Sequence, residues 1–205
     1  MLPTPTPEGA AAIRERISLL KSELAQGQSA LRAAYEARDD ALQLLRGRCQ
    51  LVDEVLKALW QDARLPPGLC LVAVGGYGRR ELYPASDIDL LFLLPDNVAQ
   101  ATERQLEALI GLLWDIGLDI GHSVRTVWQC LDEASRDITV QTNLLESRLI
   151  CGSRSLFAEY TGKTRAQLDP KAFFKGKRLE QDERYVRYQE TPYALEPNCK
   201  ESPGG

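Results

Sequence analysis

Apolar residues recur at helical spacing through the first third of the chain. The positions that repeat are Leu31, Ala34, Leu42, Leu45, Val52, Val55, Leu56 and Leu59. Spacings of three and four residues place such positions on one face of a helix. The composition is rich in Ala, Leu, Glu and Arg and is interrupted mainly by Gly27 and Gly47, so we predict two helices over residues 10–65 that pack on the rest of the protein. Residues 1–9, which include three prolines, are predicted to be disordered.

A different pattern begins after Pro66-Pro67-Gly68. Two short apolar runs follow, Leu69–Val74 and Ile88–Leu94, and each has the length and continuous hydrophobicity of a buried strand. A polar connection that contains glycines, residues 75–86, separates them. We therefore predict two strands of one sheet joined through this connection.

An amphipathic helix and a third strand are predicted next. The apolar face of the helix is formed by Leu106, Leu109, Ile110, Leu113 and Ile116. Gly117 follows the last of these, and glycine is a frequent residue just beyond a helix end. Residues 118–128 are predicted to form the third strand, and the core domain extends over residues 66–135.

Helical periodicity returns at Asp137, which we interpret as a helix cap. Helices are predicted at about 137–150, 153–168 and 171–190, in a segment, 136–191, that packs on the core. Residues 192–205 are rich in Pro and Gly and are predicted to form an irregular tail. Helices that flank a small mixed β-sheet define an α/β (α+β) fold.

Charge and cysteine content narrow the function. A net charge of −4 argues against general affinity for nucleic acid, which needs a concentrated basic face. The only histidine is His122, and no two of the five cysteines have CxxC spacing, so neither a zinc site nor a disulfide framework is expected. No apolar run is long enough to cross a membrane. These features predict a cytoplasmic protein with no nucleic-acid or membrane partner.

Two aspartates carry the clearest chemical signal. Asp87 and Asp89 lie two positions apart at the start of the second predicted strand. Alternation along a strand places both carboxylates on one face, while Ile88 and Leu90 point into the core. Two acids this close repel each other unless a cation lies between them, and Mg²⁺ (or Mn²⁺) bound to a nucleotide's phosphates suits such a pair. We predict that these aspartates are catalytic and bind the metal.

The connection before the aspartates suits a triphosphate. Glycine backbone approaches phosphates closely and offers N–H donors, and either Arg79 or Arg80 could neutralise phosphate oxygens. The segment lacks the Gly-Lys-Ser/Thr ending of a P-loop and does not match a GxGxxG dinucleotide fingerprint. The candidate nucleotide-binding residues are Gly75, Gly76, Gly78, Arg79 and Ser86.

The string GGYGRRELYPASDIDLLFLL, residues 75–94, resembles the DNA polymerase β-type nucleotidyltransferases and, among them, the bacterial PII uridylyltransferase/uridylyl-removing enzymes. Residues 113–126 and 193–205 agree with the same family, so the resemblance covers about residues 70–205. It implies transfer of UMP from UTP to a tyrosine of the PII nitrogen-signalling protein when glutamine is scarce, with release of pyrophosphate. In this resemblance Asp87 and Asp89 match the metal-binding acids, and Gly75, Gly76 and Arg79 match the nucleotide-holding turn.

The resemblance also bears on residues and domains outside the motif. The superfamily usually has a third carboxylate on a later strand, and here only Asp119 offers one; the alternative is that it faces solvent at a strand start. His122 and Arg125 are expected to face one site, with His122 either orienting a phosphate or being structural. The family's uridylyl-removing and glutamine-sensing activities belong to downstream HD-type and ACT domains, which this chain cannot contain. We therefore expect an amino-terminal piece of a longer protein.

Two other functions remain open at this point. The glycine turn and the paired aspartates are shared with adenylyltransferases, for example one acting on glutamine synthetase, and these residues do not identify the base. A different class of protein, a regulatory module that binds a nucleotide or PII without transferring anything, would retain the same residues.

Overall fold

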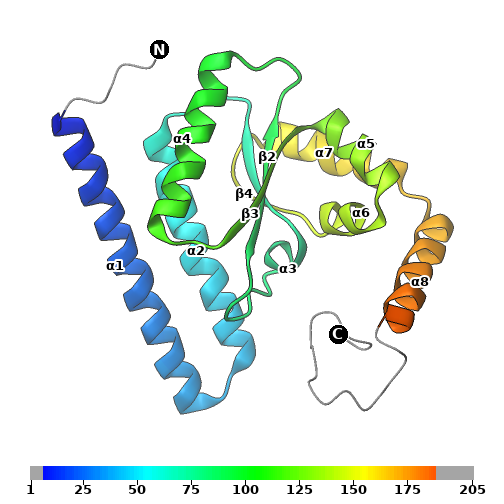
Figure 1. Ribbon diagram of the computed structural model, residues 1–205, viewed down its shortest axis with the longest axis horizontal. Helices are drawn as coiled ribbons and strands as arrows, with labels where there is room; N and C mark the ends of the chain where they lie inside the picture. Colours follow the sequence, from blue (N-terminus) through cyan, green and yellow to red (C-terminus); the bar gives the residue numbers. More distant parts are fainter. Residues whose placement is uncertain (1–6, 188–205) are drawn as a thin grey trace.

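The computed structural model describes residues 7–187 of the 205-residue chain (Figure 1). It begins with two long helices, α1 (Pro7–Arg38) and α2 (Ala41–Ala63), which form an antiparallel hairpin. The Asp40 side chain caps α2 by accepting a hydrogen bond from the Gln43 N–H. The prediction of two helices is confirmed, although α1 already includes the end of the segment predicted to be disordered.

Two glycines that seemed to interrupt the helices instead bring them together. A Cβ atom placed on Gly27 would lie 2.6 Å from the Leu51 side chain, and one on Gly47 would lie 2.4 Å from the Leu31 side chain. Each contact is too short for a real Cβ atom, so the absence of a side chain allows α1 and α2 to approach closely.

Within residues 7–187, four strands form one mixed sheet. They are β1 (Cys70–Ala73), β2 (Ile88–Leu94), β3 (Ile120–Thr126) and β4 (Arg148–Gly152), in the order β3-β2-β1-β4. β1 is antiparallel to both of its neighbours, and β2 is parallel to β3. The predicted mixed sheet within an α/β fold is confirmed.

Helices cover both faces of the sheet (Figure 1). The remaining helices are α3 (Gly75–Gly78), α4 (Gln100–Ile116), α5 (Val127–Arg136), α6 (Ile138–Leu145), α7 (Arg154–Gln167) and α8 (Pro170–Arg187). One apolar cluster joins α1, α2 and α4 to one sheet face, and a second joins α5, α6 and α7 to the other. Because both faces are covered, β2 is apolar almost throughout, as its sequence predicted. Within residues 7–187, no helix has the length and apolar character to cross a membrane.

The structure corrects the expected helix over residues 137–150. Helix α6 ends at Leu145, and residues Arg148–Gly152 form strand β4 at the edge of the sheet. This strand is five residues long, too short for alternation to distinguish it from a helix turn, and it is fixed by its pairing with β1. Helix α5 was also not predicted, although Thr126 and Gln129 form the capping box that marks its start.

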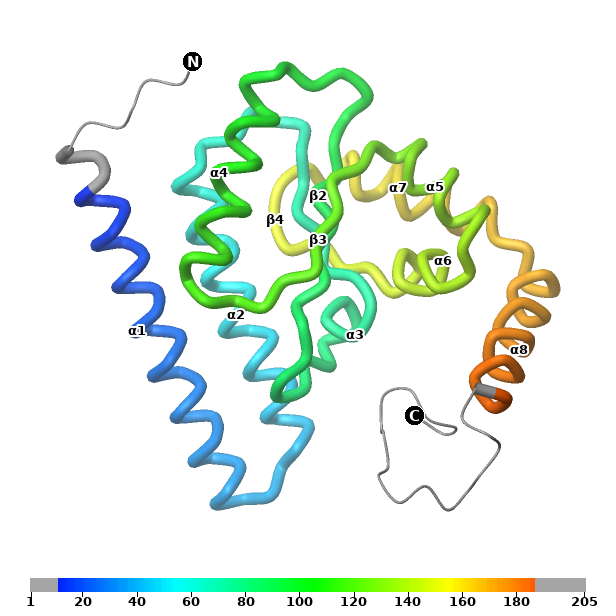
Figure 2. Tube along the Cα trace, viewed as in Figure 1, coloured from blue at the N-terminus to red at the C-terminus, as the bar shows by residue number. Residues whose placement is uncertain are grey.

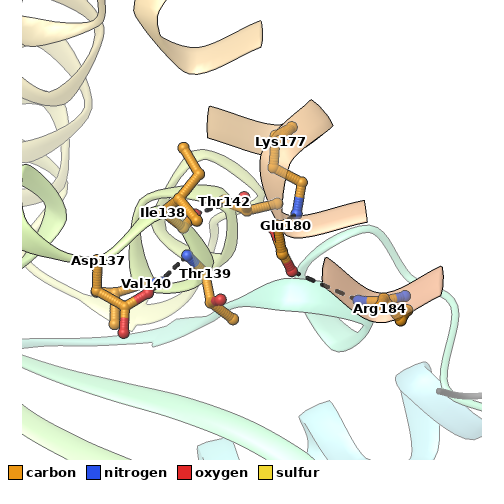
Figure 3. Close-up of polar contacts among 8 residues, drawn as sticks. All are labelled: Asp137, Ile138, Thr139, Val140, Thr142, Lys177, Glu180 and Arg184. Carbon is orange, nitrogen blue, oxygen red and sulfur yellow. Dashed lines mark hydrogen bonds and ion pairs between the residues drawn. The ribbon is translucent and has the colours of Figure 1, made fainter. Parts of the chain in front are cut away.

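The predicted cap at Asp137 is confirmed. Its carboxylate accepts hydrogen bonds from the N–H groups of Thr139 and Val140 at the start of α6 (Figure 3). At the other end of the chain, α8 reaches Arg187, so the rest of the helix expected to Glu190 and the predicted tail at 192–205 lie outside the described residues.

Candidate active site

The candidate site lies at one end of the strands, where β1 ends and β2 and β3 begin. The Val74 N–H donates to the Asp89 carbonyl at 3.1 Å, so the hydrogen-bonded pairing of β1 with β2 continues to Val74. Val74 is the last residue before the glycine turn, Gly75–Gly78. Gly75 then adopts a φ of +59°, a conformation that favours glycine, and α3 starts at this residue. The backbone therefore turns sharply beside the first residues of β2.

The two carboxylates meet above Gly121, which follows Ile120 at the start of β3. In the parallel pairing of β2 and β3, Gly121 lies opposite Asp89. A Cβ atom placed on Gly121 would be 2.7 Å from Asp89 Oδ1 and 4.0 Å from Asp87 Oδ2. Both carboxylates thus lie on the same face of the sheet, as the i, i+2 spacing predicted, with Asp89 half-buried and Asp87 exposed.

Asp89 also lies against the glycine turn, together with a residue that the sequence analysis missed. A Cβ atom on Gly75 would be 3.4 Å from Asp89 Oδ2 and 3.4 Å from Asn143 Oδ1. Asn143 belongs to α6, which contacts α3 (Figure 2). No motif or spacing marks this residue, because only the packing of α6 on α3 brings it to the site.

Gly78 has a packing role in the same turn. A Cβ atom on Gly78 would overlap the Glu146 carbonyl oxygen, at 1.8 Å, and would also meet the Ala73 carbonyl oxygen at 3.0 Å. Gly76 is less crowded, because its nearest neighbour would be the Glu81 carbonyl oxygen at 3.4 Å. Glycine at position 78 therefore lets the turn pack directly on the backbone that follows α6.

Arg79 is held by two carboxylates. Its guanidinium pairs with Glu81 at 2.8 Å and also with Glu146. Burial lowers the Arg79 pKa, but hydrogen bonds and charge from the two glutamates outweigh burial and raise the pKa overall. Arg80 instead lines a polar surface pocket with residues of α2. Of the two arginines weighed from the sequence, Arg79 is therefore the one beside the glycine turn.

The other two candidate residues, Ser86 and Asp119, lie at the margins of the site. Ser86 is half-buried, and its N–H donates to the Tyr83 carbonyl at 3.1 Å. Asp119 is exposed just before β3, and its carbonyl accepts from the Ile88 N–H at 2.8 Å. Across residues 7–187, no three His, Cys, Asp or Glu side chains are grouped so as to hold a metal ion. The described part of the chain therefore brings together two acids, without a third of these residue types to complete a cluster.

The expectation that His122 and Arg125 face one site is wrong. They lie three residues apart on β3, so strand alternation points their side chains to opposite faces. His122 is exposed and lies next to Gly121 in the chain, hence on the face opposite the carboxylates. Arg125 approaches Glu133 of α5 at 3.9 Å.

A buried polar network holds the glycine turn against α2 and β4. Arg148 of β4 donates to both carboxylate oxygens of Asp53 on α2, at 2.7 and 3.0 Å, and also donates to the Tyr77 carbonyl at 3.3 Å. The Tyr77 hydroxyl donates to Asp53, and the Arg148 guanidinium lies 5.1 Å from the Tyr77 ring centre. Burial, followed by the Asp53 charge, raises the Tyr77 pKa, so this hydroxyl remains a donor. The network ties α3 to α2 and β4.

Comparison with known proteins identifies relatives over nearly the whole chain. Proteins named bifunctional uridylyltransferase/uridylyl-removing enzyme from Aromatoleum aromaticum, Nitrosospira multiformis and Burkholderia pseudomallei are 54%, 50% and 49% identical to it, over 95%, 91% and 90% of its length. The chain spans 23%, 22% and 22% of those relatives' own lengths. The family model described as GlnD PII-uridylyltransferase matches residues 172–205.

These relatives place the chain among proteins that are named for transferring and removing uridylyl groups. It belongs to the family of bifunctional uridylyltransferase/uridylyl-removing enzymes. The resemblance noted over residues 70–205 is thus confirmed, and the likeness extends into the amino-terminal helices. A solved structure of tri-AMPylated Shewanella oneidensis HEPN toxin in complex with MNT antitoxin has a chain that is similar at 17% identity and a TM-score of 0.34, covering 69% of this chain and 97% of its own length. That similarity is too low to carry an argument.

Proposed function

We propose that this chain carries the transfer site that moves UMP from UTP to a tyrosine of the PII signalling protein. The observation that carries the proposal is the meeting of Asp87 and Asp89 above Gly121, directly beside the Gly75 turn. A pair of acids next to an open backbone turn suits a triphosphate bound together with a divalent cation. The names of the relatives support uridylylation as the form of the reaction.

The donor set fits Mg²⁺ or Mn²⁺. Carboxylate oxygens are the ligands that these hard cations prefer, and Mg²⁺ sites commonly use one or two carboxylates plus substrate phosphates. Asp89 is half-buried between Gly75 and Gly121, where a second negative charge nearby is unfavourable without a cation. Asp87 and Asp89 would hold the ion, which when bound supplies positive charge to the attacking and leaving oxygens.

The chain's other residues would position the nucleotide. Because the glycines at positions 75, 76 and 78 have no side chains, phosphate oxygens would be able to approach the backbone N–H groups of this turn. Arg79, now paired with Glu81 and Glu146, would exchange a glutamate for a phosphate oxygen. The tyrosine oxygen of PII then bonds to the α-phosphorus as the bond to the β-phosphate oxygen breaks. Pyrophosphate leaves, and the phenolic proton passes to solvent.

The reaction is tested by incubating the purified chain with PII, Mg²⁺ and UTP, and measuring the intact mass of PII. We expect PII to gain one UMP on a tyrosine, and we expect Asp87→Asn and Asp89→Asn to abolish the gain while melting as the wild type does. A gain with ATP in place of UTP would indicate an adenylyltransferase. Nucleotide binding without any gain would indicate a regulatory module, and full activity of either Asn variant would refute the metal assignment.

We further propose that this activity belongs to the cytoplasm. Cys49, Cys70, Cys130 and Cys151 are free thiols, and reduced cysteines are typical of that compartment. The net charge of −4 supports a protein and a nucleotide, rather than a nucleic acid, as the partners of the chain.

A further inference from the structure

Asn143 reaches the glycine turn and the aspartates from outside the predicted motif. Its amide oxygen and Asp89 Oδ2 both lie 3.4 Å from the position of a Cβ atom on Gly75. The amide is therefore beside the turn that would receive phosphates and beside one of the two acids. Because it is half-buried, it lines the site without being sealed in the core.

In the part of the chain that the structure describes, the side-chain amide of Asn143 does not stabilise the fold through hydrogen bonds. Within residues 7–187, no hydrogen bond ties the Asn143 side chain to another residue, whereas its neighbour Thr142 donates to the Ile138 carbonyl. An asparagine amide offers two donors and one acceptor, and leaving them unused beside a half-buried carboxylate is unfavourable unless a ligand or water meets them.

Asn143 is also held firmly in position. Asp137 caps the start of α6, and the Tyr160 hydroxyl donates to the Leu144 carbonyl at 2.7 Å near its end. Gly176 of α8 packs on Ile138, because a Cβ atom on Gly176 would be only 3.2 Å from the Ile138 side chain. The contact between Gly78 and the Glu146 carbonyl then fixes α6 relative to the glycine turn.

We infer that Asn143 donates a hydrogen bond to a phosphate oxygen of the bound nucleoside triphosphate, an inference that rests on the proposed function. A neutral donor suits this position for an electrostatic reason. Asp87 and Asp89 already place two negative charges beside the phosphates, and the amide adds a hydrogen bond without adding a third. A carboxylate at position 143 would instead repel the triphosphate.

The inference is tested by titrating Mg²⁺–UTP into the chain by isothermal titration calorimetry, using wild type, Asn143→Ala, Asn143→Asp and Gln141→Ala. Gln141 is a matched control, because two residues earlier on a helix places an amide on nearly the opposite side of α6. We expect Asn143→Ala to weaken binding about tenfold, as for one hydrogen bond to a charged group. Asn143→Asp should weaken binding further, and Gln141→Ala should bind as the wild type does.

The outcomes separate the inference from the proposed function. If wild type binds and Asn143→Ala binds equally well, the amide has no phosphate contact and only the inference fails. If Asn143→Asp binds Mg²⁺–UTP as tightly as wild type or more tightly, residue 143 lies beside the metal ion rather than the phosphates, and the inference is also overturned. If wild type binds no Mg²⁺–nucleotide, the proposed function fails and the inference fails with it. Thermal melts of all four proteins show whether each is folded.

Discussion

Replacing Gly121 with alanine should disturb the carboxylate pair while leaving the fold intact. The new Cβ atom would lie 2.7 Å from Asp89 Oδ1, whereas ordinary contact begins at 3.4 Å, so the oxygen must move by about 0.7 Å. Metal ligands tolerate errors of about 0.2 Å. The backbone of Gly121 does not need glycine, because its φ lies outside the positive range. Alanine should therefore leave stability unchanged or raise it by about 0.5 kcal/mol.

The assay is the affinity of the chain for Mn²⁺ in the presence of UTP, measured from the free Mn²⁺ signal in electron paramagnetic resonance. Displacing groups that position metal ligands typically costs 10–100-fold in affinity, so we expect Gly121→Ala to bind Mn²⁺ at least about tenfold more weakly. Gly111→Ala on α4 is the control, because nothing lies within 4 Å of its Cβ position. That variant should bind as the wild type does and gain about 1 kcal/mol of stability.

The result that would refute this reasoning is a Gly121→Ala variant that binds Mn²⁺ within about twofold of wild type, given melting curves that show both proteins folded. Asp89 would then not be a metal ligand, or the ion would lie away from β3. A large loss of stability in Gly121→Ala would instead mean that the Asp89 side chain cannot yield and that its position contributes to the fold.

Three further results are expected. In thermal melts, Mg²⁺–UTP at about a hundred times Kd should stabilise wild type by roughly 2.7 kcal/mol; Arg79→Ala should reduce this shift, whereas Arg136→Ala, in an exposed pair at the end of α5, should not. Arg148→Met leaves a buried carboxylate unpaired, so urea unfolding should show a loss of about 3–5 kcal/mol, and a loss below about 1 kcal/mol would contradict the network's role. Burial raises the pKa of Cys70 and Cys130 from 9.0 to about 12. Between these two pH values the thiols ionise in the unfolded chain but not in the folded protein. The free energy of unfolding is therefore unaffected below pH 9 and falls by about 1.4 kcal/mol per pH unit per thiol as pH rises toward 12. Equal unfolding free energies at about pH 8.5 and about pH 10.5, under reducing conditions, would contradict this.

Local patterns predicted the parts of the site that lie within one short segment. The bounds of β2 and the shared face of Asp87 and Asp89 follow from hydrophobic continuity and from a period of two. The helix end at Gly117 follows from the preference for glycine in the left-handed conformation, and the structure gives this residue a φ of +87°.

The remaining features depend on contacts between distant segments. Arg148 meets Asp53 across 95 residues, and β4 is a strand only because it pairs with the edge of β1. Asn143 reaches the site through the packing of α6 on α3, and no spacing in the sequence records that packing. Such residues become visible only once the topology is known.

The proposed transfer reaction depends most on a cation held between Asp87 and Asp89. Crystals soaked with Mn²⁺ and a non-hydrolysable UTP analogue would reveal the ion by its anomalous scattering. We predict one strong peak about 2.1 Å from oxygens of both aspartates and in contact with the analogue's phosphates. A bound analogue with no peak between these carboxylates, or with a peak elsewhere on the molecule, would contradict the proposed site.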